Sequence, residues 1–417
     1  MGRQIIVGIV TSADEKGYFS NGLHQNAFYL KMLLDQLPNV TPLLLIPPNL
    51  PDGTRGPDSA EIFGNTAHNL DLFREKYHLD ILLCVSVVFS NKYLNEFRKN
   101  GVKIAAVIYG NRYIIDQEVT AFGHLVHPEE GGINHASHSI IRENGSYDAV
   151  WLSPHFAWQK DYIKHRNQGD RAYVCPYIWS EKIHRLKYAE DPHYKNKSPE
   201  FQPGRENNRK IFTTEPSINV VKTNLFPYQA TNLAYTLGAT NLDMAYFFGG
   251  SKLAVQNPHT KAYFSNFPLA RDKKCYFLQR HKFSYITSLA QVMFHHHFQN
   301  GLNYTLLEAA DLKLPIVHNS EFMPELGYYY PGANLSIAAK QITKALNHED
   351  SEDLKKYEDD CRKTVYKFHI SNAENIRGYQ TLLANLLNSD IEPELPQYIV
   401  DLEYKLDHSD GYISPLG

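Results

Sequence analysis

The chain has 417 residues, of which 43% are hydrophobic and 21% charged, and these values are typical of a globular protein with two or three domains. Its net charge of −3 shows no broad basic footprint, so duplex nucleic acid is a disfavoured partner, although a local basic groove stays open. The cysteines lie far apart without a CxxC pair, which predicts free thiols rather than a zinc or disulfide framework: Cys84, Cys175, Cys275 and Cys361.

The amino terminus enters an apolar run directly, with Ile5-Ile6-Val7, so we expect a strand there and no signal peptide. No apolar run approaches the ~18 residues that a membrane helix requires. We therefore predict a cytoplasmic protein without an integral membrane part, which would reach membrane glycolipids only peripherally.

Short apolar runs alternate with helical patterns through the first half of the chain. Strands are predicted over residues 5–10, 42–46, 81–88, 103–109, 149–152 and 173–176. Helices are predicted over 22–37, 69–77 and 93–100, and a Pro/Gly/Asp-rich loop over 49–66. Strands that alternate with helices form a parallel sheet covered on both faces.

Residues 189–209 are rich in Pro, Asn and Lys and are the best candidate for a linker. The alternation restarts after it, with strands over 210–214, 245–248 and 274–278 and helices over 222–237, 284–292, 335–347 and 353–368. We therefore predict an α/β protein with two doubly wound domains, residues 1–204 and 205–385, and a tail over 386–417.

The stretch over residues 294–319 carries the clearest chemical signal. It predicts an Asn/Gly loop, a short helix capped by Asn300 or Asn303, and a buried strand after Pro315. A helix that follows such a loop presents unpaired amides and the positive end of its dipole to an anion. Glu308 lies further along this helix, where its carboxylate could accept two hydroxyls of a ribose.

This stretch resembles the donor-site segment of GT-B glycosyltransferases, in the retaining clade whose second domain carries two glutamates eight positions apart. Glu308-Ala-Ala and Pro315-Ile-Val match the second half of that pattern, and Asn300 replaces the first glutamate. The chain also resembles an uncharacterised bacterial family with a GT-B-like second half and the signature N-Y…P-x-V-H-N-S. The resemblance implies two Rossmann-like domains that face each other across a cleft, with a last helix, near 372–388, returning to the first domain.

The resemblance also implies a role for particular donor-site residues. Glu308 would hold the ribose, Lys222 the diphosphate, and Asn300 would lie near the sugar, while Thr213, Thr214 and Glu215 would line the same cleft. A solvated helix glutamate and a solvated lysine are the alternative interpretations of Glu308 and Lys222. The remaining candidate donor contacts are Gly22, Gly249, Gly250, Asn303, Tyr304, Thr305, Asn319 and Ser320. For the two adjacent glycines, an ordinary tight turn is the alternative.

Ligands of open parallel sheets bind beyond the carboxyl ends of the strands, so the loops near residues 11–25 and 110–127 are candidates for the acceptor. Asp116, Glu118 and His124 are candidates for a base if the enzyme inverts configuration. Retention is what the resemblance implies, although Asn111 stands where retaining relatives often have a histidine.

Four histidines lie in or beside the donor stretch. On a strand His295 and His297 share a face, which makes a metal site with His318 conceivable. We favour a role in lining the sugar pocket, because no cysteine or carboxylate joins them and GT-B chemistry does not generally depend on metal. No metal or cofactor is therefore expected, and the nucleotide-diphosphate sugar is a donor substrate.

The leading hypothesis is a glycosyltransferase that moves a sugar from a nucleotide-diphosphate sugar to an acceptor hydroxyl, in glycan or glycoconjugate synthesis. One alternative is a glycosyltransferase acting on modified DNA bases, which would need a basic surface formed by residues 160–171 and 182–197. Another is a non-catalytic nucleotide- or sugar-binding protein, for which Asn300 is the motivation.

Overall fold

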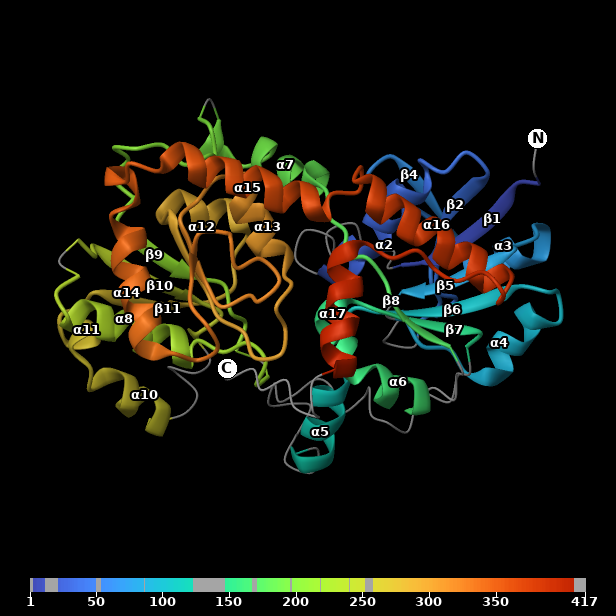
Figure 1. Ribbon diagram of the computed structural model, residues 1–417, viewed down its shortest axis with the longest axis horizontal. Helices are drawn as coiled ribbons and strands as arrows, with labels where there is room; N and C mark the ends of the chain where they lie inside the picture. The colour runs from blue at the N-terminus through green and yellow to red at the C-terminus, as the bar shows by residue number, and fades with distance from the viewer. Residues whose placement is uncertain are drawn as a thin grey trace. The chain divides into compact units, whose positions relative to one another are not determined.

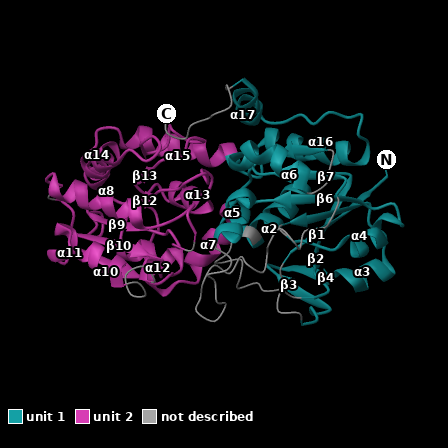
Figure 2. Ribbon diagram, turned by 90° about the horizontal axis from the view of Figure 1, so that it is seen from below, with its two compact units in different colours: residues 1–180, 368–410 teal, residues 181–367, 411–417 magenta. Residues whose placement is uncertain are grey.

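The computed structural model describes residues 3–11, 22–49, 54–85, 87–122, 147–166, 171–195, 197–217, 219–239, 241–251 and 258–408. The chain divides into two compact units, which Figure 2 colours separately. The first contains Met1–Ser180 and Phe368–Asp410, and the second contains Glu181–Lys367. Each unit has its own sheet of mainly parallel strands with helices around it (Figure 1), which confirms the predicted α/β fold class.

The sheet of the first unit has the strand order β3-β4-β2-β1-β5-β6-β7-β8. Its strands are β1 (Ile5–Val10), β2 (Val40–Ile46), β3 (Ser59–Ile62), β4 (Asn65–Asn69), β5 (Ile81–Val85), β6 (Lys103–Ile108), β7 (Ala149–Leu152) and β8 (Ala172–Val174). The antiparallel hairpin of β3 and β4 corrects the loop predicted over 49–66. Phe63 and Gly64 both have positive φ, as a tight hairpin turn requires, and the short polar strands gave no apolar signal.

The helices of the first unit come from both ends of the chain. The amino-terminal part supplies α2 (Gly22–Leu34), α3 (Leu70–Lys76), α4 (Asn91–Arg98), α5 (Arg112–Phe122) and α6 (Lys160–Arg166), and the carboxyl-terminal part supplies α16 (Ala373–Leu387) and α17 (Gln397–His408). On α16 the buried Tyr379 hydroxyl donates to the carbonyl of Pro176 at 2.9 Å and lies 3.0 Å from the hydroxyl of Tyr109. The helix expected near 372–388 therefore returns to the first unit.

The sheet of the second unit has the order β11-β10-β9-β12-β13-β14, with all neighbours parallel. Its strands are β9 (Lys210–Thr213), β10 (Met244–Phe248), β11 (Cys275–Leu278), β12 (Val292–His295), β13 (Ile316–His318) and β14 (Tyr328–Tyr329). Its helices are α7 (Glu181–Ala189), α8 (Leu225–Thr236), α10 (Pro258–Ser265), α11 (Pro268–Arg271), α12 (Phe283–Leu289), α13 (Tyr304–Asp311), α14 (Leu335–Leu346) and α15 (Leu354–Phe368).

The boundary between the units lies at 180/181, earlier than the expected boundary after residue 204. Residues 189–209 are not a linker but part of the second unit. The Tyr188 and Tyr194 hydroxyls lie 2.8 and 2.7 Å from the hydroxyl of Thr287, and Asn208 donates to the carbonyl of Gln202 at 2.9 Å. Polar side chains of this segment form hydrogen bonds within the second unit. Composition alone does not show whether polar side chains bind the protein or water.

Two further points complete the fold. The helix predicted over 284–292 ends at Leu289, and Val292 already begins β12, because two apolar segments are separated by only two residues. Within the described part of the chain, no helix has the length and apolar character needed to cross a membrane.

Candidate functional site

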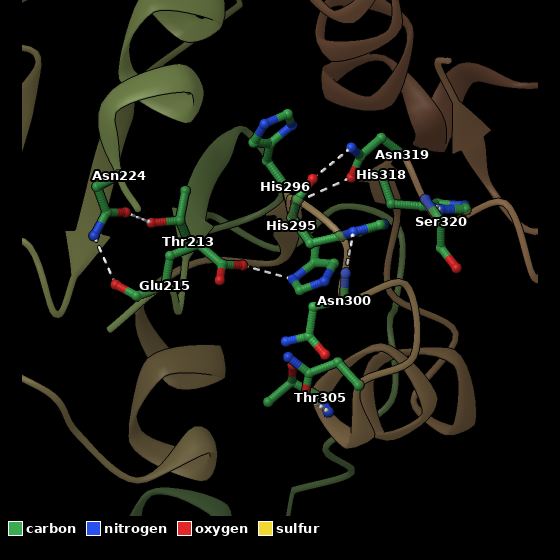
Figure 3. Close-up of polar contacts among 12 residues, drawn as sticks. Thr213, Glu215, Asn224, His295, His296, Asn300, Thr305, His318, Asn319 and Ser320 are labelled. Carbon is green, nitrogen blue, oxygen red and sulfur yellow. Dashed lines mark hydrogen bonds and ion pairs between the residues drawn. The ribbon is translucent and has the colours of Figure 1, made fainter. Parts of the chain in front are cut away.

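The second sheet reverses its direction of growth between β9 and β12. From β9 the strands continue outward to β10 and β11, and from β12 they continue the other way to β13 and β14. In open parallel sheets, ligands bind beyond the carboxyl ends of the strands at such a switch point. The loops that leave β9 and β12 therefore define the candidate site, and Figure 3 shows their side chains.

A buried carboxylate and a buried imidazole meet at this switch point. Glu215 follows β9 by two residues, and His295 is the last residue of β12. Glu215 Oε1 lies 2.6 Å from His295 Nδ1, and the side chains are 1% and 0% exposed. The contact is close but is not aligned as a hydrogen bond, and His295 Nε2 is buried without a hydrogen bond inside the described chain. We call these two residues the Glu215–His295 pair.

Asn224, the residue before α8, ties the loop between β9 and α8 to the end of β10. Its Oδ1 accepts from the hydroxyl of Thr213, and its Nδ2 donates to the carbonyls of Glu215 at 2.7 Å and Phe248 at 3.3 Å. These bonds fix the backbone around Glu215. Sequence reasoning overlooked Asn224 because it expected the helix to begin at Lys222, whereas α8 begins at Leu225.

The adjacent glycines after β10 serve this packing. Gly249 has a φ of +79°, and a Cβ there would lie 2.5 Å from the carbonyl oxygen of Glu215. At Gly250 a Cβ would lie 2.8 Å from the ring of Phe277. The close approach that these glycines allow is to the chain itself, which matches the tight-turn alternative for this segment.

Lys222 lies in the turn that precedes α8, where its carbonyl accepts from the amide of Ser217 at 3.2 Å. Burial lowers the pKa of the ammonium group, the negative charge of Glu215 opposes this shift, and the positive charge of Arg280 adds to it. The turn that contains Lys222 is joined to the loop after β12, since Phe298 donates its amide to the carbonyl of the preceding residue, Val221, at 2.9 Å. Lys222 thus faces the carboxylate of the Glu215–His295 pair. Thr214, between Thr213 and Glu215, is half-buried.

The amino end of α13 follows the loop after β12. Asn303 is the N-cap, since its Oδ1 accepts from the amide of Thr305 at 3.2 Å. Asn300 is half-buried, and its amide donates to His297 Nδ1 at 3.1 Å. Tyr304 is buried, and the hydroxyl of Thr305 is buried without a hydrogen bond to any described residue. This confirms the predicted loop and short helix, with Asn303 rather than Asn300 as the cap.

Glu308 is held by a partner that sequence reasoning did not supply. Lys187 Nζ on α7 donates to Glu308 Oε1 at 2.9 Å, and the two side chains are 5% and 2% exposed. The solvated glutamate offered as an alternative is therefore wrong. The ribose-binding role stays a prediction, and a ligand would meet a carboxylate that already has a cation.

The residues after β13 hold the loops of the site in place. Asn319 accepts from the amide of His297 at 3.1 Å and donates to the carbonyls of His297 at 2.9 Å and Gly332 at 3.0 Å. Ser320 donates to the carbonyl of Gly301 at 2.6 Å. Both side chains therefore position the loop that precedes α13, and contact with a diphosphate stays a prediction for them.

Two other histidines of the cluster, His318 and His296, are packed rings with lowered pKa values. Burial lowers the pKa of His318 to about 4, and its Nε2 donates to the carbonyl of Leu326 at 2.6 Å. Burial lowers the pKa of His296 to about 3, and its ring stacks on Phe226 with centroids 4.0 Å apart. His296 Nδ1 lies 2.8 Å from the hydroxyl of Tyr330. Among the described residues, no group of His, Cys, Asp and Glu is arranged to hold a metal ion.

In the first unit, Asp116 is enclosed. Its carboxylate accepts from Arg166 Nε at 2.7 Å and from the hydroxyl of Tyr162 at 2.6 Å, and the side chain is 0% exposed. This geometry favours a structural role over the catalytic base that was considered. Gly22 begins α2, and its carbonyl accepts from Asn26 at 2.8 Å. His124 lies outside the described residues.

Several basic residues expected on a nucleic-acid surface bind internal partners instead. Lys160 pairs with Glu403 at 2.7 Å, and Arg171 donates to the carbonyl of Asn385 at 3.0 Å. Arg166 and Lys187 are the buried partners described above. These contacts leave less unpaired positive charge on residues 160–171 and 182–197 for binding to DNA.

Comparison with known proteins connects this geometry to a family. Residues 5–383 match the model of a family described as "Protein of unknown function (DUF2827)". The chain belongs to the DUF2827 family. No curated protein matches this DUF2827 chain significantly.

Solved structures share the fold at low identity. Trehalose-6-phosphate synthase from Burkholderia multivorans is 11% identical with a TM-score of 0.53, over 94% of this chain and 99% of that chain. The N-terminal domain of trehalose-6-phosphate phosphatase from Candida albicans is 10% identical with a TM-score of 0.54, over 94% and 98%. A trehalose-6-phosphate synthase studied with bisubstrate glycomimetics is 12% identical with a TM-score of 0.54, over 93% and 99%. The DUF2827 chain therefore has the two Rossmann-like units of GT-B glycosyltransferases.

Proposed function

We propose that this protein is a glycosyltransferase that moves a sugar from a nucleotide-diphosphate sugar to an acceptor hydroxyl. The observation that carries the proposal is the polar cluster at the switch point of the second sheet. There Glu215 contacts His295 and acts electrostatically on Lys222, and the loop that follows His295 leads to the amino end of α13. The neighbours with this fold include sugar-transferring synthases, which supports the reaction class.

The donor belongs to the second unit in this proposal. Negative charge develops on the diphosphate as the bond to the sugar breaks, and fixed cations and amides aimed at it lower the barrier. Lys222 and the first amides of α13 would bind the diphosphate, and Asn300 would lie near the sugar. Glu308 would reach the ribose through the oxygen that Lys187 does not bind.

The acceptor belongs to the first unit, beyond the ends of β1 and β6, near Gly22 and Asn111. Retention of configuration fits a site in which the base candidate Asp116 is enclosed by Arg166 and Tyr162. The nucleotide sugar is a substrate, so the reaction needs no separate cofactor. The acceptor is a sugar-bearing molecule in glycan or glycoconjugate synthesis.

A second candidate function is nucleotide- or sugar-binding without transfer. Two observations favour it: Asn300 replaces the first glutamate of the donor pattern, and Glu308 is neutralised by Lys187. Turnover decides between the two functions. Slow hydrolysis of a nucleotide sugar, lost in Lys222→Ala and retained in the exposed-lysine control Lys356→Ala, would rule out the non-catalytic function.

The first experiment is a thermal-shift panel of ADP, GDP, UDP and dTDP and of their glucose esters, each with and without EDTA. A ligand at about 100 times its dissociation constant adds about 2.7 kcal/mol to the folded state. We expect one nucleotide to raise the melting temperature of the wild type and to have a reduced effect on Lys222→Ala. No shift with any member of the panel would contradict the nucleotide-sugar proposal.

A further inference from the structure

Burial of the Glu215–His295 pair lowers the free energy of unfolding unless its polar atoms find partners. Both side chains are at most 1% exposed, so neither charge is solvated by water. Taking a carboxylate and an imidazolium out of water costs free energy that their attraction repays only when the remaining polar atoms are also satisfied. Here they are not, because His295 Nε2 makes no hydrogen bond within the described chain.

Buried polar atoms in proteins nearly always have a partner, so an unpartnered one is a candidate contact for a ligand. The hydroxyl of Thr305, in the first turn of α13, is a second buried atom without a hydrogen bond in the described chain. Figure 3 shows the side chains of Asn300 and Thr305 below the ring of His295, on the loop and helix that follow β12. The end of β12 and the first turn of α13 thus supply two buried polar atoms without a hydrogen bond in the described chain, beside a helix amino end, and this combination suits an anion.

We propose that His295, held doubly protonated by Glu215, donates a hydrogen bond from Nε2 to the diphosphate of the nucleotide sugar. This inference rests on the proposed function and assigns the cation at the switch point. Glu215 is then a positioning residue, since it acts on the substrate through the imidazole. Lys222 lies within the electrostatic reach of the same carboxylate.

The chemical step follows directly. The bond between the sugar C1 and the diphosphate oxygen breaks, and its electron pair stays on that oxygen. The acceptor oxygen forms the new bond to C1, and its proton passes to the released diphosphate. His295 remains protonated throughout, and its hydrogen bond strengthens as charge grows on the oxygen it contacts.

Several charged and titratable groups surround the pair. The negative charge of Glu215 and the positive charge of Arg280 both act on Lys222. The ring of His297 also lies beside that of His295, with centroids 5.9 Å apart. His296 and His318 also face His295, but burial lowers the pKa of their imidazoles to about 3 and about 4, so neither gains charge near neutrality. Burial keeps the Tyr330 phenol near Glu215 protonated. The diphosphate of a nucleotide sugar is esterified at both ends and does not titrate there.

The experiment measures the affinity of the wild type, His295→Gln and Glu215→Gln for the nucleotide sugar that stabilises the wild type in the glucose-ester panel. Calorimetry at pH 6, 7 and 8 gives the dissociation constants. A charged hydrogen bond accounts for about tenfold or more in affinity, so we expect His295→Gln to bind at least tenfold more weakly at pH 6. Glu215→Gln should also bind more weakly than the wild type at each pH, because the imidazole loses the carboxylate that holds it.

His348→Gln is the matched control. His348 is also buried in the second unit, and its Nδ1 lies 2.8 Å from the hydroxyl of Tyr328. Its neighbour Glu349 accepts a hydrogen bond from Asn208, which lies just before the amino end of β9. His348 therefore lies near the amino ends of the strands, whereas the candidate site lies at their carboxyl ends. We expect this variant to lose stability and to keep wild-type affinity at each pH.

A measurement on the unaltered chain covers the case in which His295→Gln does not fold. Nitrogen NMR of ¹⁵N-histidine-labelled wild type should show one doubly protonated imidazole whose Nε2 resonance shifts when the nucleotide sugar binds. Equal affinities and equal pH profiles for wild type and Glu215→Gln, or no such imidazole, would overturn the assignment and leave the proposed function standing. Absence of binding to the wild type would instead remove the proposed function.

Discussion

Removing one partner of the Lys187–Glu308 ion pair should destabilise the second unit strongly. Glu308→Gln keeps the shape of the side chain and leaves the ammonium of Lys187, 5% exposed, without its carboxylate. Breaking a buried ion pair in this way costs about 3–5 kcal/mol, whereas an exposed pair costs about 0–1 kcal/mol. We therefore expect a loss of about 3 kcal/mol, and replacement of both residues in Lys187→Met/Glu308→Leu should recover most of it.

Two probes separate this effect from a general loss of stability. All three tryptophans, Trp151, Trp158 and Trp179, belong to the first unit, so their fluorescence reports that unit alone. Far-UV circular dichroism reports both units. With a urea dependence of about 2–3 kcal/mol/M, Glu308→Gln should lower the second unit's midpoint by roughly 1 M or more and move the fluorescence transition much less.

The refuting result is specific. The ion pair contributes nothing to stability if the free energy of unfolding of Glu308→Gln lies within about 0.5 kcal/mol of the wild-type value while nucleotide binding is lost. The glutamate would then be available to the ribose, as the resemblance to GT-B donor sites implies. The exposed pair of Arg362 and Glu358 provides the control, since Glu358→Gln should change stability by less than about 1 kcal/mol.

Three further predictions address other parts of the chain. Gly249→Ala should cost about 2–4 kcal/mol, because its φ is +79° and a Cβ would lie 2.5 Å from the carbonyl of Glu215. Gly238→Ala, with φ +94° and open space around it, should cost only about 1 kcal/mol, and equal urea midpoints for the two would contradict the packing argument. Asp116→Asn should lower the stability of the first unit by about 3 kcal/mol through loss of its buried contact with Arg166, measured by tryptophan fluorescence; unchanged stability with lost turnover would instead restore its role as a base. Burial lowers the pKa values of His296, His318 and His348 to about 3, 4 and 4, so below the usual value of about 6.5 the unfolded chain binds more protons and stability falls with falling pH. Each histidine should contribute about 1–2 kcal/mol of loss between pH 7 and pH 5, and urea midpoints that stay constant over this range would contradict their neutral burial.

The sequence predicted the features that depend on local pattern. Alternating strands and helices indicated two α/β domains, and the loop, N-cap and short helix around Asn303 follow from capping and apolar spacing within about ten residues. The Gly249 turn was also recognised as one of two alternatives. The resemblance to GT-B enzymes added the overall plan and the returning helix.

Features that depend on distant contacts were not predicted. Glu215 meets His295 only because β9 and β12 are neighbours, and strand order cannot be obtained from periodicity. Lys187 reaches Glu308 from α7, a short helix beside a segment whose polar composition indicated a linker. The β3–β4 hairpin was overlooked because its strands are short and polar. For both ion pairs the decisive partner lies far away in the chain, whereas for the hairpin the missing signal is apolar alternation.

The return of α16 has a consequence for how the protein is made on the ribosome. The described residues of the second unit all fall between Glu181 and Lys367, whereas the first unit draws on segments before and after that range. Domains generally fold as units during synthesis, in the order in which their residues emerge. The first unit lacks the core contacts of Tyr379, Leu382 and Leu383 until α16 has left the exit tunnel, long after its own strands have emerged. The second unit, although translated later, can therefore complete its fold before the first. Until α16 emerges, the nascent first sheet exposes apolar residues to which chaperones can bind.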